Sequence, residues 1–162
     1  MLAQHPFNRR SLSVAAAALL AGAVACSDST GPDAISVEFN IGPPIIGLLL
    51  EPGVEVMGGP GFMTIAGRIP TATPCFDIVV NAWRAEQRVT VDVVAYERPG
   101  VACATVVATF RYRGAVGNLA AGEYEAHVFY AFVAADGTPT AGPAFHRRVE
   151  VVPAGSPLTD EP

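Results

Sequence analysis

The chain has 162 residues, of which 51% are hydrophobic and 15% are charged, and its ten arginines face fifteen acidic residues with no lysine. The net charge of −5 argues against a nucleic-acid partner, because the phosphate backbone selects basic surfaces. Sixteen glycines and fourteen prolines are dense for helices and usual for short strands joined by many turns. Sparse charge also suggests a well-buried core or an apolar surface for a partner.

Residues 1–25 have the pattern of a cleaved secretory signal. Arg9 and Arg10 form the basic region, and an apolar segment over residues 12–25 follows it, ending in small residues. This segment is too short for a spanning helix, which needs roughly 20 residues. Once the signal is removed, eight arginines remain against fifteen acids, a net charge of −7.

The end of this segment, Ala23-Val24-Ala25-Cys26, resembles the lipobox of bacterial lipoproteins. The resemblance implies that Cys26 is lipidated and becomes the first mature residue, and Ser27 after it implies the outer membrane. Ala23 replaces the usual leucine, so ordinary signal-peptidase cleavage after Ala25 stays open as an alternative. We expect an exported, lipid-anchored protein of the cell envelope, because several acyl chains hold a protein durably at a membrane. Residues 26–34 would be the lipidated tether.

Residues 35–152 are expected to form one β-sandwich domain, and residues 153–162 a flexible tail. Alternation of apolar and polar residues predicts strands over residues 35–40, 62–69, 105–113, 123–133 and 145–152. The apolar run over residues 45–50 suggests a short buried strand, and residues 54–57 a weaker one. With the hairpin described next, this predicts an all-β, antiparallel, immunoglobulin-like sandwich of about seven to eight strands.

The central feature is a hairpin within residues 75–103, which has a cysteine at each end. Both strands alternate with period two, so only a loop with an even number of residues keeps the apolar faces together across the pair. A four-residue loop over residues 85–88 is favoured over the two-residue Glu86-Gln87, which is not of the type found in the tightest turns. The resulting register places Val80 opposite Val93, Ala82 opposite Val91 and Asn81 opposite Asp92.

The two hairpin cysteines are expected to form a disulfide. If Cys26 carries lipid, Cys75 and Cys103 remain as an even pair in an oxidising compartment. A bridge requires Cα atoms roughly 4.4–6.8 Å apart. A flat meander would separate the two cysteines by two strand spacings, roughly 9–10 Å. The chain after Arg98 is therefore expected to cross to a second layer.

Leu119, Gly122 and Tyr124 resemble the L-x-x-G-x-Y entry to a late strand of immunoglobulin-like domains. The resemblance implies a tyrosine corner, in which the Tyr124 hydroxyl bonds back to the upstream backbone. No cysteine follows Tyr124 by two residues, so the pattern of antibody-type domains is not matched.

The outer face of the hairpin is the candidate binding surface, with Trp83, Asn81, Asp92 and Tyr96 on it. Trp and Tyr are frequent anchors of binding surfaces, although coverage of these residues by another segment is an open alternative. No catalytic residues, metal site or cofactor are predicted. His127 and His146 on neighbouring strands are expected to be surface residues, and Asp77 and Asp92 to be solvated carboxylates.

These features predict a non-enzymatic envelope lipoprotein with a binding or structural module. Its expected partners are the membrane, through the lipid anchor, and an envelope protein or glycan. The alternative is a secreted inhibitor of an enzyme, or a small hydrolase with a site built from loops. Residues 58–61 or Pro99-Gly100 would be the inhibitory loop.

Overall fold

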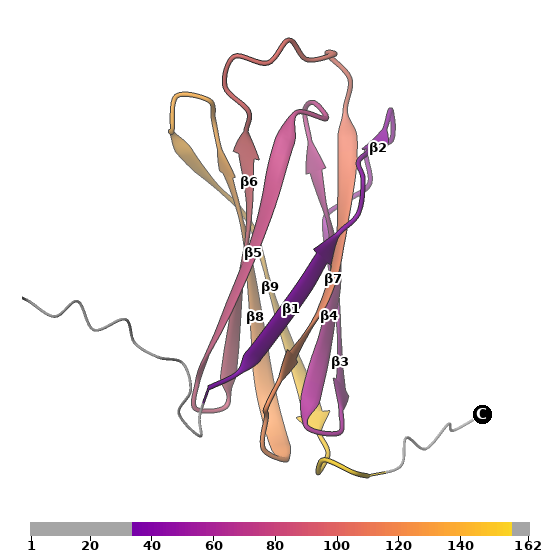
Figure 1. Ribbon diagram of the computed structural model, residues 1–162, viewed down its shortest axis with the longest axis vertical. Coiled ribbons are helices and arrows are strands. Elements are labelled where there is room, and N and C mark those ends of the chain that lie inside the picture. Colours follow the sequence, from indigo (N-terminus) through magenta and orange to yellow (C-terminus); the bar gives the residue numbers. More distant parts are fainter. Residues whose placement is uncertain (1–33, 157–162) are drawn as a thin grey trace, which may run out of the picture.

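The computed structural model describes residues 34–156, which form two layers of β-strands (Figure 1). None of these residues belongs to a helix that is long and apolar enough to cross a membrane. The predicted signal peptide, Cys26 and the end of the tail lie outside the described residues, so these assignments stay predictions. The strands are β1 (Ser36–Ile41), β2 (Ile45–Ile46), β3 (Gly53–Gly59), β4 (Phe62–Thr71), β5 (Phe76–Ala85), β6 (Arg88–Glu97), β7 (Ala108–Gly117), β8 (Gly122–Val133) and β9 (Pro139–Val151).

One sheet has the order β1-β7-β4-β3, with β2 also paired to β7, and the other has the order β5-β6-β8-β9. This arrangement confirms the all-β sandwich, with nine described strands where about seven to eight were expected. All pairs are antiparallel except β6 and β8, which are parallel. The parallel pair arises because β7, which lies between them in the chain, belongs to the other sheet. It carries the chain back to the end of the sandwich at which β6 begins, so β8 runs in the same direction as β6.

The expected strand over residues 45–50 is wrong in its second half, since only Ile45 and Ile46 pair with β7. Beyond them, hydrogen bonds to the buried side chain of Thr109 take the place of backbone pairing between strands. Its Oγ1 donates a hydrogen bond to the Leu48 carbonyl (2.7 Å) and accepts one from the Leu50 N–H (3.1 Å). The chain therefore forms a loop instead of a buried strand, and the side chains of Leu48 and Leu49 are exposed.

The predicted hairpin register is confirmed, because Val80 pairs with Val93, Ala82 with Val91 and Asn81 with Asp92. The preference for a four-residue loop is wrong. Ala85 pairs with Arg88, so the turn is the two-residue Glu86-Gln87, with Glu86 at a positive φ of 55°. The N–H of Glu125 on β8 donates to the Gln87 carbonyl (2.9 Å), which holds this tight turn from a distant part of the chain.

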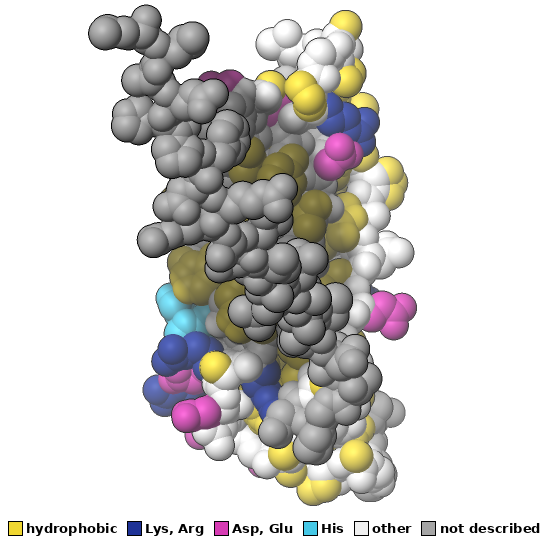
Figure 2. Space-filling model, turned by 60° about the vertical axis from the view of Figure 1, so that its left-hand side comes forward, with side chains coloured by type: hydrophobic (Ala, Val, Ile, Leu, Met, Phe, Trp, Pro, Cys, Tyr) yellow, Lys and Arg dark blue, Asp and Glu magenta, His cyan; other side chains and the backbone are white. Residues whose placement is uncertain are grey.

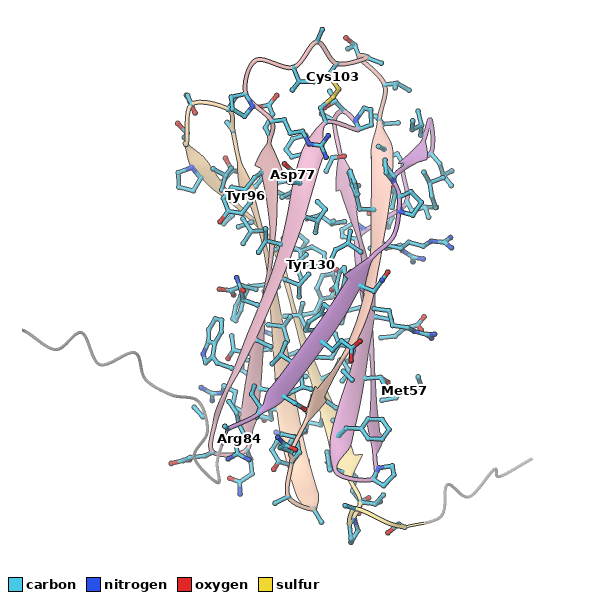
Figure 3. The ribbon with its side chains drawn as sticks, in the orientation of Figure 1. Met57, Asp77, Arg84, Tyr96, Cys103 and Tyr130 are labelled. Atoms are coloured by element: carbon cyan, nitrogen blue, oxygen red, sulfur yellow. A yellow bond between two sulfur atoms is a disulfide. The ribbon has the colours of Figure 1, made fainter. Side chains whose placement is uncertain are left out.

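The structure contains the predicted disulfide between Cys75 and Cys103, whose Cα atoms lie 6.0 Å apart. The Arg98 N–H donates to the Cys75 carbonyl (3.0 Å), and the chain then crosses to β7 in the other sheet, as the distance argument required. The bond joins the β4–β5 connection to the β6–β7 connection at one end of the sandwich (Figure 3).

Replacing both cysteines, as Cys75→Ala with Cys103→Ala, should lower the free energy of unfolding by about 2–5 kcal/mol, because the open chain gains entropy when unfolded. Chemical denaturation monitored by Trp83 fluorescence would measure this loss. A reducing agent should destabilise the wild type by a similar amount and leave the double variant unchanged. Equal unfolding free energies for the wild type and the variant would contradict the prediction.

The core lies between the sheets and includes a pair of buried tyrosines, Tyr112 on β7 and Tyr130 on β8. Their hydroxyls lie 2.9 Å apart, and the Tyr130 hydroxyl also donates to the Gly53 carbonyl (3.1 Å). Figure 3 shows Tyr130 between the two layers. Gly67 makes room for this pair, because a Cβ there would overlap the Tyr112 hydroxyl.

Tyr124 is buried, with 4% of its surface exposed, but no tyrosine corner forms. Its hydroxyl makes no hydrogen bond among the residues that the structure describes. The hydroxyls that link distant parts of the fold are instead those of Tyr112 and Tyr130.

The tyrosine pair should make the fold sensitive to alkaline pH. Burial raises the pKa of Tyr112, and it raises the pKa of Tyr130 from 10.0 to about 12. A raised pKa means that the folded state favours the neutral phenol, so stability is complete below pH 10 and is lost as the pH rises towards 12. Denaturant unfolding across this range should show a falling free energy of unfolding.

The variant Tyr130→Phe tests whether the tyrosine pair causes the loss of stability at alkaline pH. It should cost about 1 kcal/mol at neutral pH through its lost hydrogen bonds, but its stability should fall less steeply above pH 10. Parallel losses in the wild type and in Tyr130→Phe would show that the alkaline transition comes from other groups.

Candidate functional site: the outer face of the four-stranded sheet

The structure places the four predicted surface residues on the outer face of the β5-β6-β8-β9 sheet. Alternation along β5 and β6 directs their neighbours Val80, Val91 and Val93 inward. The side chains of Trp83 and Tyr96 are 45% and 43% exposed, Asn81 is exposed, and Asp92 is half-buried. Asn81 and Asp92 stand directly opposite each other.

Two further apolar side chains on this face are well exposed, Val79 on β5 and Phe129 on β8, each at 40%. The parallel register places Phe129 beside Asp92 and His127 beside Thr90. We call Val79, Asn81, Trp83, Asp92, Tyr96 and Phe129 the aromatic face. Alternation along β8 would have marked Phe129 as outward-facing, but its place beside Asp92 requires the β6–β8 pairing, which no local pattern indicates.

A cluster of histidines and charged groups borders the aromatic face. The rings of His127 and His146, on paired positions of β8 and β9, have centroids 4.3 Å apart and are nearly perpendicular. His127 Nε2 lies 3.4 Å from Glu125 Oε2, and Arg148 Nη2 lies 3.2 Å from Glu125 Oε1. Figure 2 shows histidine side chains between hydrophobic groups and a group of arginine and acidic side chains.

Hydrogen bonding to His127 and then to Arg148 lowers the pKa of Glu125. The carboxylate thus stays ionised near neutral pH and keeps its contacts with both side chains. Within residues 34–156, no three His, Cys, Asp or Glu side chains are grouped so that they hold a metal ion. The cluster is best described as a charged border of the aromatic face.

Asp77 and Asp92 do not come together as a pair of carboxylates. Asp77 stands opposite Tyr96 on β6, and its Oδ1 forms an ion pair with Arg98 Nη2 at 2.6 Å. Both partners are well exposed, so this ion pair contributes little to stability.

No protein-family model matches the chain, and neither a curated protein nor a solved structure is significantly similar to it. The case for function therefore depends on the chemistry of the site alone.

Proposed function

We propose that the chain is a non-enzymatic lipoprotein of the cell envelope whose β-sandwich is a binding or structural module. The observation that carries the proposal is the exposure of three aromatic residues, Trp83, Tyr96 and Phe129, on the outer face of one sheet. Asn81 and Asp92 lie among them. Aromatic anchors supply contact area, while polar groups between them direct hydrogen bonds, a combination that suits recognition of an envelope protein or glycan.

The proposed anchor at Cys26 suits the orientation of the domain. The described chain starts at the end of the sandwich where the β5–β6 turn lies, opposite the disulfide end (Figure 1). The eight residues that follow Cys26, residues 27–34, span at most about 26–29 Å when fully extended. Trp83 precedes the β5–β6 turn, so it would meet partners close to the membrane.

One of the two loops considered for an inhibitor is poorly suited to that role. Gly58 and Gly59 belong to β3, and the turn after them is held by backbone hydrogen bonds. The Gly61 N–H donates to Val152, and the Leu119 N–H donates to Gly61, each at 3.0 Å. Residues 58–61 thus do not project for insertion into an enzyme. Pro99-Gly100 is exposed and keeps the inhibitor alternative open for a screen against hydrolases.

Lipidation is tested by metabolic labelling with a fatty acid. The wild type should incorporate the label, and Cys26→Ser should abolish it, because the thiol is the proposed attachment point. The double variant Cys75→Ala with Cys103→Ala is the matched control and should keep the label. Label that persists in Cys26→Ser would overturn the lipoprotein proposal.

The binding surface is tested by Trp83→Ala. Loss of an anchor should weaken capture of an envelope component by about tenfold or more, equivalent to about 1.4 kcal/mol. The melting midpoint should change little, because the side chain is 45% exposed. The measurement is binding to fractionated envelope protein and envelope glycan.

Met57→Ala is the control for this experiment, because Met57 is 57% exposed on β3 of the other sheet. Figure 3 shows Met57 and Tyr96 on opposite sides of the molecule. Unchanged capture by Trp83→Ala, or a large drop in its melting midpoint, would remove the aromatic face from the proposal.

A further inference from the structure

A second site lies away from the aromatic face, near the edge where β3 packs against β9. It is a hollow of about 480 Å³. Three arginines line it, Arg68 from β4, Arg111 from β7 and Arg147 from β9, together with one acid, Glu55 from β3. Its apolar wall includes Pro52, Val54 and Phe145.

Three guanidinium groups and one carboxylate leave this hollow with a net positive charge. Arg68 Nε donates to the Glu51 carbonyl (2.8 Å), and Arg147 Nη1 donates to the His146 carbonyl (2.9 Å). These acceptors are neutral backbone groups. In the described part of the chain, neither the three arginines nor Glu55 takes part in an ion pair. Arg98 and Arg148, by contrast, both have acidic partners, in a chain with more acids than bases.

Two of the arginines are also direct neighbours, since Arg68 on β4 is paired with Arg111 on β7. Like charges placed directly opposite across two strands destabilise the pair. The wall beside them is nevertheless linked to the core by a hydrogen bond. The Arg68 guanidinium passes over Gly53, with its Nη2 3.4 Å from the position that a Cβ would take. The Gly53 carbonyl accepts a hydrogen bond from the buried Tyr130.

We propose that this hollow binds the phosphate group of an organic ligand. Arginine forks match the oxygens of phosphate. A phosphate group presents more oxygen acceptors than the two of a carboxylate, so it can bond to several guanidinium groups at once. The apolar wall then accommodates the organic part of the ligand. The site is independent of the aromatic face and of its partner.

Calorimetric titration of the full chain with phenyl phosphate tests the site, with benzoate as the carboxylate of similar shape. Phenyl phosphate should bind at least about tenfold more tightly than benzoate. Arg111→Ala should weaken phenyl phosphate binding at least about tenfold, and Arg111→Lys should restore only part of it, because lysine keeps the charge but lacks the fork. Arg113→Ala removes the same charge two residues along β7, outside the hollow, and should bind like the wild type.

Soluble compounds and lipid headgroups both carry phosphate groups of this kind, and a vesicle assay separates the two sources. The full chain carrying Cys26→Ser, without the acyl anchor, is mixed with vesicles of phosphatidylcholine with and without phosphatidic acid. Sedimentation only with phosphatidic acid, lost in Arg111→Ala, assigns the phosphate to a lipid. Binding of phenyl phosphate without such sedimentation assigns it to a soluble compound.

Three results would overturn the proposal. These are no binding of either phosphate probe, equal binding of benzoate and phenyl phosphate, and equal losses in Arg113→Ala and Arg111→Ala. Equal losses in these two variants would show that phenyl phosphate is attracted by positive charge in general and not by the hollow. The melting midpoint supplies a second check, because Arg111→Ala removes the like-charged neighbour of Arg68 and should leave the midpoint unchanged or raise it. A lower midpoint would contradict the repulsion on which the argument depends.

Discussion

Burial of the inner faces of the two sheets constrains the rest of this structure. Val89, Val91 and Val93 of β6 are fully buried, and burying one such side chain contributes roughly 1.5–3 kcal/mol. A slip of the hairpin by one residue would exchange the two faces and lose these contributions together. The same alternation that buries the valines therefore exposes Trp83 and Tyr96. The aromatic face is thus coupled to the core, because its position follows from the register that the core requires.

The path of the chain between the layers decides which side chains become neighbours on that face. The chain leaves β6 near the disulfide, runs through β7 in the other sheet and comes back beside β6 as β8. This route makes β6 and β8 parallel and places Phe129 next to Asp92. An antiparallel neighbour in the same position would face Asp92 with a different residue. The composition of the site therefore depends on a crossover through the opposite layer, and the disulfide holds that crossover at one end.

Local patterns were sufficient for those parts of the fold whose causes are local. The hairpin register followed from period-two alternation, and the second layer followed from the reach of a disulfide between Cys75 and Cys103. Features with distant causes were missed. The two-residue turn is held by Glu125, and the loop after β2 is held by Thr109, both far from those segments in the sequence. The sequence motif around Tyr124 suggested a hydroxyl bond to the upstream backbone, but in the structure it is the Tyr130 hydroxyl that donates to a backbone carbonyl, that of Gly53.

The buried tyrosines also connect the core to the arginine-lined hollow. Among the described strands of its sheet, β3 is an edge strand that pairs only with β4, so its first residue has few backbone constraints. The hydroxyl of Tyr130, which belongs to the opposite sheet, donates to the carbonyl of that residue, Gly53. This bond links the two layers at the point where Arg68 passes over Gly53. The core therefore holds in place the part of the wall that Arg68 contacts, although Arg68 and Arg111 repel each other. A site of this kind is ordered before any ligand arrives, so binding of an anion would not have to supply the free energy of ordering the wall.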